Sequence, residues 1–301
     1  MSIWPFGKAH SHAHPAMQDV LVTLLVMAWS VEAREPYTGG HLWRVSRMAE
    51  LLARHAGLSE IDVSRVAIGA FVHDIGKLGV SEAILCKSVS LSDDELDIIH
   101  THASAGAHLL AGNPMAALML DAVMSHHERP DGSGYPAGLK GDEIPREARI
   151  VAICDAFDAM TCERPYGPPM SLTEALDEIR ANIGTQFDRR FAEHFLTLAE
   201  TGELEHIVGH SDDGVPVLAC KLCGPTLVVR REQGIGDTVF CRRCGGEHVL
   251  ATDPHGVLEA RQTGRVGGLR DLEARPDLAL IQRFVDRAAR TVLGRGLRIA
   301  A

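Results

Sequence analysis

A histidine and an aspartate lie where the apolar face of a predicted helix should continue. The helix predicted to begin after Ser59 carries apolar residues between Val63 and Ala70 at the spacing of one helical face. The same spacing leads on to His73 and Asp74, so both side chains are predicted to point into the core. A buried carboxylate is costly unless it is paired or binds a metal ion. The dipeptide therefore has two interpretations, a hydrogen-bonded polar pair in the core or part of a metal site.

Further imidazole and carboxylate side chains lie at the ends or on the inner faces of other predicted helices. They are His41, His102, His126, His127, Asp155 and Asp158. The whole set is too large for its members to be satisfied in pairs, and it exceeds what one ion with an open coordination position needs. Mixed imidazole and carboxylate ligands favour Fe, Mn, Ni or Zn over Ca. We therefore predict a site for two metal ions that share one bridging carboxylate.

The elements that must position these residues are predicted to be helices, because helical periodicity extends from residue 17 to about residue 201. Capping patterns at Ser59 and Ser92 mark two helix starts. Pro114 suits the first turn of a helix that runs to about His127. Further helices are predicted from Thr38 to Gly57, over residues 146–161, 172–183 and 188–201, and from Asp277 to Leu293.

Four of the seven cysteines form two Cys-x2-Cys pairs, Cys220 with Cys223 and Cys241 with Cys244, separated by 17 residues. This is the spacing of a four-cysteine zinc site, and because four protein ligands leave no open position, a structural role is predicted. No strand is predicted before residue 215, whereas the chain around the pairs is β-prone, as in a zinc ribbon. Basic residues leave nucleic-acid binding as an alternative to the favoured protein docking, namely Lys221, Arg230, Arg231, Arg242 and Arg243.

Composition and charge exclude several classes of protein. The 301 residues are 46% hydrophobic and 23% charged, which excludes collagen-like and wholly disordered chains. Forty acidic residues against 30 basic ones give a net charge of −10, which argues against sequence-independent binding of DNA. The longest apolar stretch, from Val20 to Val31, is too short to cross a bilayer, and no secretory signal is recognised. The odd number of cysteines is typical of a reducing compartment, so a cytoplasmic location is predicted.

The ordered motifs resemble those of the HD superfamily of metal-dependent phosphohydrolases. Residues 71–77 read FVHDIGK and look like its HDxGK motif. Residues 126–136 read HHERPDGSGYP and are similar to the HHExxDGxGYP motif of the HD-GYP subfamily. The resemblance spans about residues 20–200 and implies an all-α HD-GYP helical domain. Further matching segments lie at residues 35–41, 144–150, 155–161, 164–166 and 184–188.

The resemblance implies a role for each matching residue. The first metal ion would be held by His41, His73, Asp74 and Asp155, and the second by Asp74 with His102, His126 and His127. Both ions are expected to be divalent transition metals, Fe or Mn. Lys77 would contact the phosphate, so Asp74 and Lys77 are the predicted catalytic residues. The predicted substrate-binding residues are Gly134, Tyr135, Pro136, Asp158 and Arg164.

The chain departs from the family pattern at two positions. Some members have a glutamate four residues before the first ligand histidine, where it helps to hold a third metal ion; here Tyr37 takes that place, so two ions are expected. Many members have a basic residue after the Arg-Pro-Tyr triplet, where this chain has Gly167, which removes one phosphate contact. Glu128, next to the ligands, is interpreted either as an acceptor that orients a ligand histidine or as a solvent-exposed side chain.

HD-GYP domains are cyclic dinucleotide phosphodiesterases, so the resemblance implies hydrolysis of cyclic di-GMP to pGpG, and onward to GMP. Two readings stay open beside it. One is a non-catalytic module that senses a cyclic dinucleotide or docks a protein, and the other is a phosphodiesterase for another cyclic dinucleotide. The expected partners are cyclic di-GMP and a protein bound through the ribbon or the C-terminal tail. Neither nucleic acid nor a membrane is an expected partner.

The sequence divides into segments of different character. We predict a flexible tail over residues 1–16, the HD-GYP domain over 17–205 and a linker over 206–219. A zinc ribbon is predicted over 220–250, with β-prone runs at 226–230 and 238–240, and an Arg-rich tail with a terminal helix over 251–301.

Overall fold

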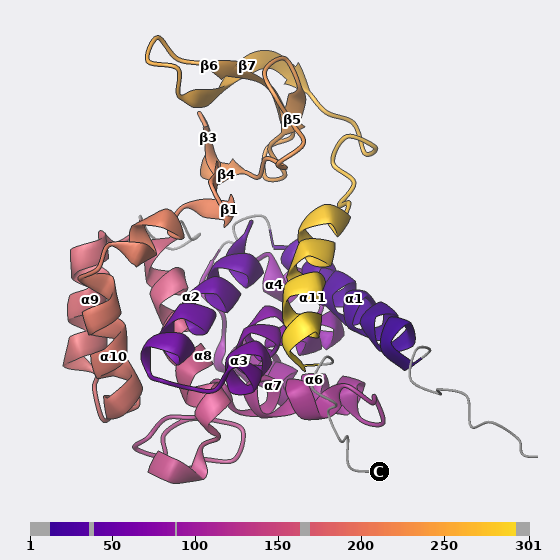
Figure 1. Cartoon of the computed structure of the whole chain (residues 1–301). Coiled ribbons are helices and arrows are strands. Elements are labelled where there is room, and N and C mark those ends of the chain that lie inside the picture. The colour runs from indigo at the N-terminus through magenta and orange to yellow at the C-terminus, as the bar shows by residue number, and fades with distance from the viewer. Residues whose placement is uncertain (1–12, 36–38, 88, 163–168, 293–301) are drawn as a thin grey trace, which may run out of the picture.

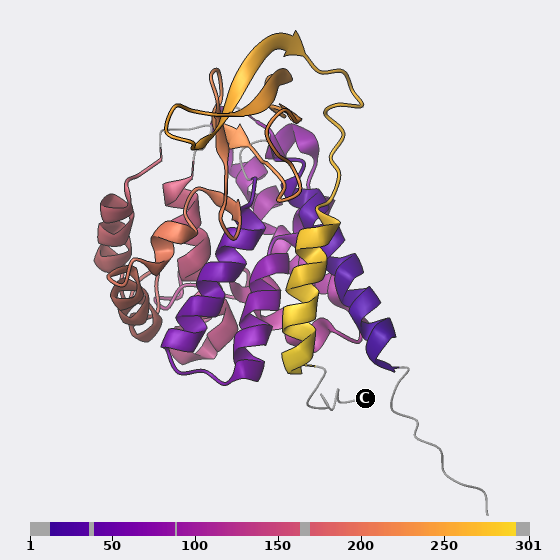
Figure 2. The same ribbon diagram turned by 45° about the horizontal axis from the view of Figure 1, so that its top comes forward.

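The computed structural model describes residues 13–35, 39–87, 89–162 and 169–292. A bundle of helices forms the body of the molecule, and a small β module lies beyond one end of it (Figure 1). The chain then returns to the body as a last helix, which lies beside the first helix (Figure 2). A helical domain with a C-terminal β module and a terminal helix was the expected fold class, and it is confirmed.

The helices and strands have the following bounds along the chain. The α-helices are α1 (Ala13–Glu32), α2 (His41–His55), α3 (Glu60–Val72), α4 (Glu82–Leu85), α5 (Asp93–His100), α6 (His102–Leu110), α7 (Leu120–Ser125), α8 (Arg146–Thr161), α9 (Leu172–Ala181), α10 (Arg189–Ala199) and α11 (Leu278–Val292). The 3-10 helices are η1 (Ile75–Gly79), η2 (Ala116–Leu118), η3 (Gly141–Glu143) and η4 (Glu203–His206). The strands are β1 (His210–Asp212), β2 (Val215–Pro216), β3 (Leu218–Cys220), β4 (Gly224–Leu227), β5 (Thr238–Phe240), β6 (Gly246–Thr252) and β7 (Leu258–Val266).

Side-chain caps begin α3 and α5 where the sequence predicts them. The Ser59 hydroxyl accepts the backbone N–H of Asp62 at 3.2 Å. Ser92 and Glu95 form a complete capping box, in which each side chain accepts the backbone N–H of the other residue. Such a cap satisfies backbone donors that have no partner inside the helix. The predicted helix at 146–161 is also confirmed, since α8 has these bounds.

Two predicted helix starts differ in the structure. Helix α2 begins at His41 after Gly40, whose φ of 81° is a left-handed conformation that glycine adopts without strain. Thr38, the predicted cap, lies outside the described residues. The helix predicted from Pro114 is divided into η2 and a shorter α7. The Asn113 carboxamide accepts the backbone N–H of Met115 at 2.8 Å, and this local turn competes with a continuous helix.

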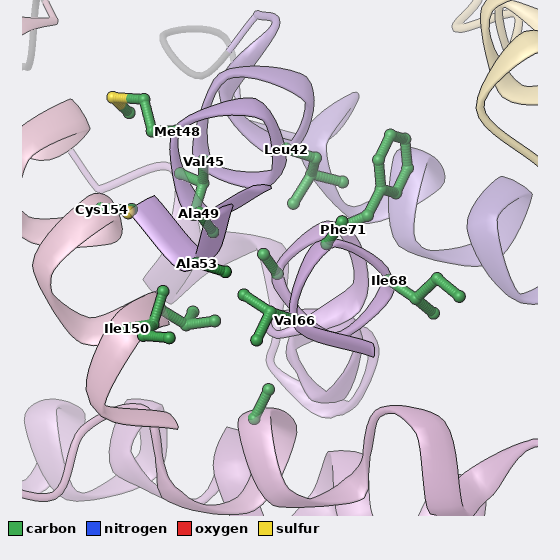
Figure 3. Close-up of a cluster of buried hydrophobic side chains, with 14 of the residues drawn as sticks. Leu42, Val45, Met48, Ala49, Ala53, Val66, Ile68, Phe71, Ile150 and Cys154 are labelled. Atoms are coloured by element: carbon green, nitrogen blue, oxygen red, sulfur yellow. The ribbon is translucent and has the colours of Figure 1, made fainter. Parts of the chain in front are cut away.

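One large core fills the helical body, and its centre lies between α2, α3 and α8 (Figure 3). Val45 of α2, Val66 of α3 and Ile150 of α8 are fully buried there. The last helix belongs to the same core, because the ring of Phe284 in α11 packs 5.0 Å from that of Phe71 in α3. This α11 fits the predicted terminal helix at Asp277 to Leu293, and its first turn is capped by the Asp277 carboxylate.

The β module has a second, much smaller core. Strands β5, β6 and β7 form an antiparallel sheet, and β3 and β4 form an antiparallel hairpin. Leu218, Leu227 and Leu250 are buried between them together with three cysteines. The expected strand at 238–240 is confirmed as β5, whereas β4 ends at Leu227 rather than at residue 230.

Two strands lie where none was expected. Strand β1 precedes residue 215, and β7 lies in the segment predicted as an Arg-rich tail. Most side chains of β7 are exposed or half-exposed, so its sequence lacks the alternation that reveals a strand. Its pairing with β6, and the packing of Leu258 and Ala260 on the small core, hold it in place. At the other end of the chain, α1 begins at Ala13, inside the tail predicted over residues 1–16. Among the described helices, none has the length and apolarity that a membrane span requires.

Candidate metal centres

The seven predicted metal ligands converge at the helix ends of the body. His41 is the first residue of α2 and His102 the first of α6, while His73 and Asp74 directly follow α3. Asp155 comes from the middle of α8, and the adjacent pair His126 and His127 follows α7. Three groups have ligand atoms within 4.8 Å of one another: His41 with His73 and Asp155, His73 with Asp74 and His126, and His102 with His126 and His127.

Asp74 lies between two of these groups. Its Oδ2 is 3.5 Å from Nε2 of His73, and its Oδ1 is 3.4 Å from Nε2 of His102. On one side, Asp155 Oδ1 lies 3.5 Å from Nε2 of His41. On the other side, the Nε2 atoms of His102 and His126 are 3.3 Å apart. The two oxygens of one carboxylate therefore face two sets of imidazoles, which is the arrangement that a bridging ligand needs.

Backbone carbonyls orient three of the imidazoles. Nδ1 of His73 donates to Ala70 O at 2.7 Å, Nδ1 of His102 to Ile99 O at 2.6 Å, and Nδ1 of His126 to Ala122 O at 3.0 Å. A carbonyl only accepts, so in each neutral ring Nδ1 carries the proton and Nε2 offers its lone pair to the site.

Nε2 of His73 is buried and has no hydrogen-bond partner among the residues that the structure describes. A buried polar atom without a partner is rare and calls for an explanation, and a bound metal ion supplies one. The donor set of imidazoles and carboxylates fits a divalent transition metal. The residues present therefore fit the metal group that the motifs imply.

A model of the HD domain matches residues 26–191, which is more than half of the chain. The chain belongs to the HD domain family. It is 39% identical over 189 residues to the cyclic di-GMP phosphodiesterase response regulator RpfG of Xanthomonas campestris pv. campestris, a match that covers 62% of this chain and 50% of the relative.

Two further relatives extend this comparison. A cyclic di-GMP phosphodiesterase of Thermotoga maritima is 40% identical over 184 residues, covering 60% of this chain and 50% of that one. The 3'3'-cGAMP-specific phosphodiesterase 3 of Vibrio cholerae is 37% identical over 180 residues, covering 59% and 39%. The chain thus spans about half or less of the length of these curated relatives. HD-domain phosphohydrolases are metal-dependent, and the converging His and Asp groups of this HD domain agree with that property.

The glycine of the HDxGK motif allows two elements of the HD domain to touch. A Cβ on Gly76 would lie 1.8 Å from the backbone oxygen of His102 and 2.4 Å from the backbone nitrogen of Gly106. Only glycine permits η1 to lie this close to α6. This contact brings Asp74, just before η1, next to His102 at the start of α6.

Charge in the HD domain site is balanced around Asp74. The Lys77 ammonium lies 2.7 Å from Asp74 Oδ2 and 3.2 Å from Glu35 Oε1. Burial by itself raises the pKa of the Asp74 carboxyl, but Lys77 and the nearby histidines hold it well below its ordinary value. The two carboxylates in turn raise the pKa of Lys77. Burial lowers the pKa of His126 to about 3, so this imidazole is neutral at pH 7 and free to bind a metal ion.

Asp158 occupies a different place from the one the motifs led us to expect. It was expected near the phosphate or the metal-bound water, but its side chain is buried behind the predicted ligand His41, whose Nδ1 lies 2.8 Å from Asp158 Oδ2. The guanidinium of Arg44 donates to both carboxylate oxygens, at 2.6 and 3.0 Å. Arg44 lowers the pKa of Asp158, which thus stays charged against the imidazole of His41. No motif in the sequence points to Arg44, and its position on the buried face of α2 is the only local signal for its role.

The Gly-Tyr-Pro loop folds back onto the histidine cluster. The Tyr135 ring stacks on the imidazoles of His127, at 4.7 Å, and of His100, at 4.0 Å. A Cβ on Gly134 would lie 2.5 Å from His127 O, so this close return also requires glycine. Pro136 follows a cis peptide bond. Nothing in the sequence indicated a role for His100, because this residue belongs to none of the recognised motifs.

Glu128 fits neither of its two interpretations. It is buried, and its carboxylate accepts the backbone N–H groups of Ala137 at 2.7 Å and Leu139 at 3.0 Å. It therefore holds the loop of the HD domain that carries Tyr135 rather than a ligand histidine. Arg164, Gly167 and Tyr37, which also figure in the sequence analysis, lie outside the described residues.

The four cysteines of the β module also converge. Their Sγ atoms all lie within 4.8 Å of one another, and those of Cys220 and Cys244 are 3.7 Å apart. The Sγ of Cys241 lies 3.3 Å from the Thr226 hydroxyl. Burial raises the pKa of the Cys241 thiol, but this hydroxyl and nearby backbone N–H groups outweigh it and lower the pKa to about 7. The group could hold a metal ion, and a thiolate is the form that binds one.

A cavity of about 410 Å³ opens beside the His and Asp site. This volume lies within the range of about 300–1,000 Å³ that is usual for ligand pockets. The lining includes His126, His127, Asp155 and Tyr135. The HD domain therefore offers space for a ligand next to the predicted metal ligands.

Proposed function

We propose that this chain is a binuclear-metal phosphodiesterase that hydrolyses cyclic di-GMP to pGpG, with further hydrolysis to GMP left open. One observation carries the proposal: Asp74 presents its two oxygens to two sets of imidazoles, with the Lys77 ammonium beside it. The names of the relatives in Xanthomonas and Thermotoga agree with this substrate.

The proposed ligands form two sets that share Asp74. One ion would be held by His41, His73, Asp74 and Asp155, and the other by Asp74, His102, His126 and His127. We infer Fe or Mn for these two sites, because both suit mixed imidazole and carboxylate ligands. When bound, such ions stabilise negative charge on phosphoryl oxygens and lower the pKa of water. A single zinc ion would be held by the thiolates of Cys220, Cys223, Cys241 and Cys244, with a structural role.

The side chains of this chain have distinct tasks in the proposed reaction. Lys77 would stabilise the negative charge that develops on the phosphoryl or leaving oxygen, a role that suits an ammonium held beside the site. The substrate pocket would be lined by the loop of Gly134, Tyr135 and Pro136. The ring of Tyr135 in this loop stacks on His127. Asp158 would orient His41 by accepting a hydrogen bond from its Nδ1–H group, as carboxylates do behind metal-bound histidines. Arg164 remains a proposed phosphate contact.

A second candidate function is hydrolysis of another cyclic dinucleotide. The Vibrio cholerae relative named as specific for 3'3'-cGAMP is 37% identical to this chain, which is close to the identity of the cyclic di-GMP enzymes. A sensing module without catalysis is the third candidate function.

The free cysteines and the small nucleotide substrate favour a cytoplasmic location. The β module and tail would bind a protein partner.

The test is turnover of cyclic di-GMP by the full chain loaded with Mn or ferrous iron. Linear pGpG should form, and Asp74→Ala should abolish its formation and lower the content of Fe or Mn, since both ions lose a ligand. Asp94→Ala, on the exposed face of α5, is the matched control and should retain both. Binding of cyclic di-GMP without release of pGpG would favour the sensing module, and faster turnover of 3'3'-cGAMP would favour the second candidate.

A further inference from the structure

The cavity beside the His and Asp site has one wall made by a single face of α8. Ala152, Asp155, Ala156, Ala159 and Met160 line it, at spacings of three and four residues. Apart from Asp155, this face is apolar and built from small or flexible side chains. Such a wall suits the flat face of an aromatic ring. Helix α9, which packs against α8, and the turn after it provide a second part of the lining (Figure 1).

The residues from α9 and its following turn carry hydrogen-bonding groups with spare capacity. Oε1 of Glu178 accepts the side-chain N–H of Asn182 at 2.9 Å, and its Oε2 has no hydrogen bond or ion pair within the described part of the chain. The side-chain amide of Gln186 likewise makes no hydrogen bond to any described residue, although it lines the cavity. Arg129 also lines it and forms no ion pair with the described residues.

The pattern of these groups matches one nucleobase better than another. Guanine presents two adjacent N–H donors, at N1 and the 2-amino group, and a carboxylate accepts both. Its O6 and N7 atoms accept, and they pair with an arginine or an amide N–H donor. Adenine places an acceptor at N1, which a carboxylate repels. A pocket with an acidic, a basic and an amide group beside an apolar wall is therefore complementary to guanine.

We propose that Glu178, Gln186 and Arg129 form a guanine-binding subsite, with the Glu178 carboxylate as the group that discriminates against adenine. The inference rests on the proposed function in that the same cavity holds the scissile phosphodiester beside Asp155 and His127. It adds the specificity: both cyclic di-GMP and 3'3'-cGAMP contain a guanine and should be accepted, whereas cyclic di-AMP should be rejected.

The experiment compares Glu178→Gln with the original chain, both in full length and loaded with Mn. The substitution keeps the size of the side chain and the acceptor for Asn182, and Glu178 is exposed, so folding should be retained. The loss of a hydrogen bond to a charged group predicts a roughly 10- to 100-fold fall in kcat/KM for cyclic di-GMP, mainly through KM. Turnover of cyclic di-AMP should rise or stay the same. Asp177→Asn, one residue earlier on α9 and absent from the cavity lining, is the matched control and should change neither.

A base-free phosphodiester separates failure of the subsite from failure of the enzyme. Glu178→Gln should hydrolyse bis(para-nitrophenyl) phosphate as fast as the original chain, since this probe has no base to be recognised. An unchanged ratio of cyclic di-GMP to cyclic di-AMP activity in Glu178→Gln would overturn the subsite while leaving the enzyme intact. If the original chain hydrolyses no phosphodiester, the dissociation constants of the two nucleotides decide instead. Weaker binding of cyclic di-GMP by Glu178→Gln would then support the subsite, and equal binding or no binding would overturn it.

Discussion

The two candidate metal centres of this chain are held in opposite ways. The imidazoles of the HD domain project from the ends of helices that share one large core, and backbone carbonyls fix His73, His102 and His126 in orientation. The four cysteines of the β module instead form part of a very small core, in which Cys220, Cys223 and Cys241 are buried among a few aliphatic side chains.

This difference indicates what each centre contributes to folding. A core as large as that of the helical body supports the His and Asp site without a metal ion, so an ion would bind to a site that already exists. A core as small as that of the β module falls below the size that folds without a staple. There, the free energy of metal binding is free energy of folding. The comparison therefore predicts that the two centres respond differently to the same perturbation.

The largest expected effect comes from removing one of the four clustered cysteines of the β module. Cys220→Ser should unfold the β module, so the amide protons of β3 to β7 should lose their protection from exchange, while those of α2, α3 and α8 keep it. Hydrogen exchange read by mass spectrometry measures both regions at once. Cys86→Ser removes a thiol outside the cluster and should change neither region.

A contact between the two regions makes this prediction sharper. Gly39 leaves room for Val228 of the module, because a Cβ there would lie 2.3 Å from the Val228 methyl carbon. The guanidinium of Arg242 also stacks over the Trp29 ring at 5.3 Å. Loss of protection in α2 as well as in the module would show that these contacts join the regions into one cooperative unit, and the comparison would then be wrong.

The next largest effect should follow from removing the cation behind the HD domain site. Arg44→Met leaves the Asp158 carboxylate buried without the guanidinium that pairs with it, which should lower the free energy of unfolding by about 3–5 kcal/mol. Denaturant unfolding followed by circular dichroism at a helical wavelength measures this. Arg189→Met, at an exposed position of α10, is the control and should cost less than about 1 kcal/mol. If Arg44→Met also lowered the free energy of unfolding by less than about 1 kcal/mol, the stability of the fold would not depend on the ion pair of Arg44 with Asp158.

The smallest of the three effects concerns the last helix, which follows the β module in sequence but packs in the helical core. Phe284→Ala removes the ring that packs on Phe71, and it should lower the free energy of unfolding of the body by about 3 kcal/mol. Leu278→Ala, at an exposed position of the same helix, should have little effect. Exchange protection in β5 and β6 should stay the same in both variants. If Phe284→Ala alone removed that protection, α11 would belong to the cooperative folding unit of the β module and not to that of the helical body.

Much of the helical body could be predicted from local patterns. Ser59 and Ser92 cap helices as expected, and α8 has its predicted bounds, because caps and apolar periodicity act within a few residues of the chain. The His and Asp residues stood out for the same reason, since His73 and Asp74 interrupt an apolar face. The cysteine spacing likewise predicted four thiols that converge.

Tertiary structure decided the features that depend on partners far apart in sequence. Strand β7 exists through its pairing with β6, and Arg44 matters because Asp158, 114 residues later, lies against it. Glu128 and His100 acquire their places from the return of the Gly-Tyr-Pro loop, which no local pattern encodes. The sequence by itself determined which residues could bind metal and which helices carry them. Only the packing of those helices decided that the two oxygens of Asp74 face two different sets of imidazoles. That geometry depends on contacts between distant segments, such as the one between Gly76 and His102.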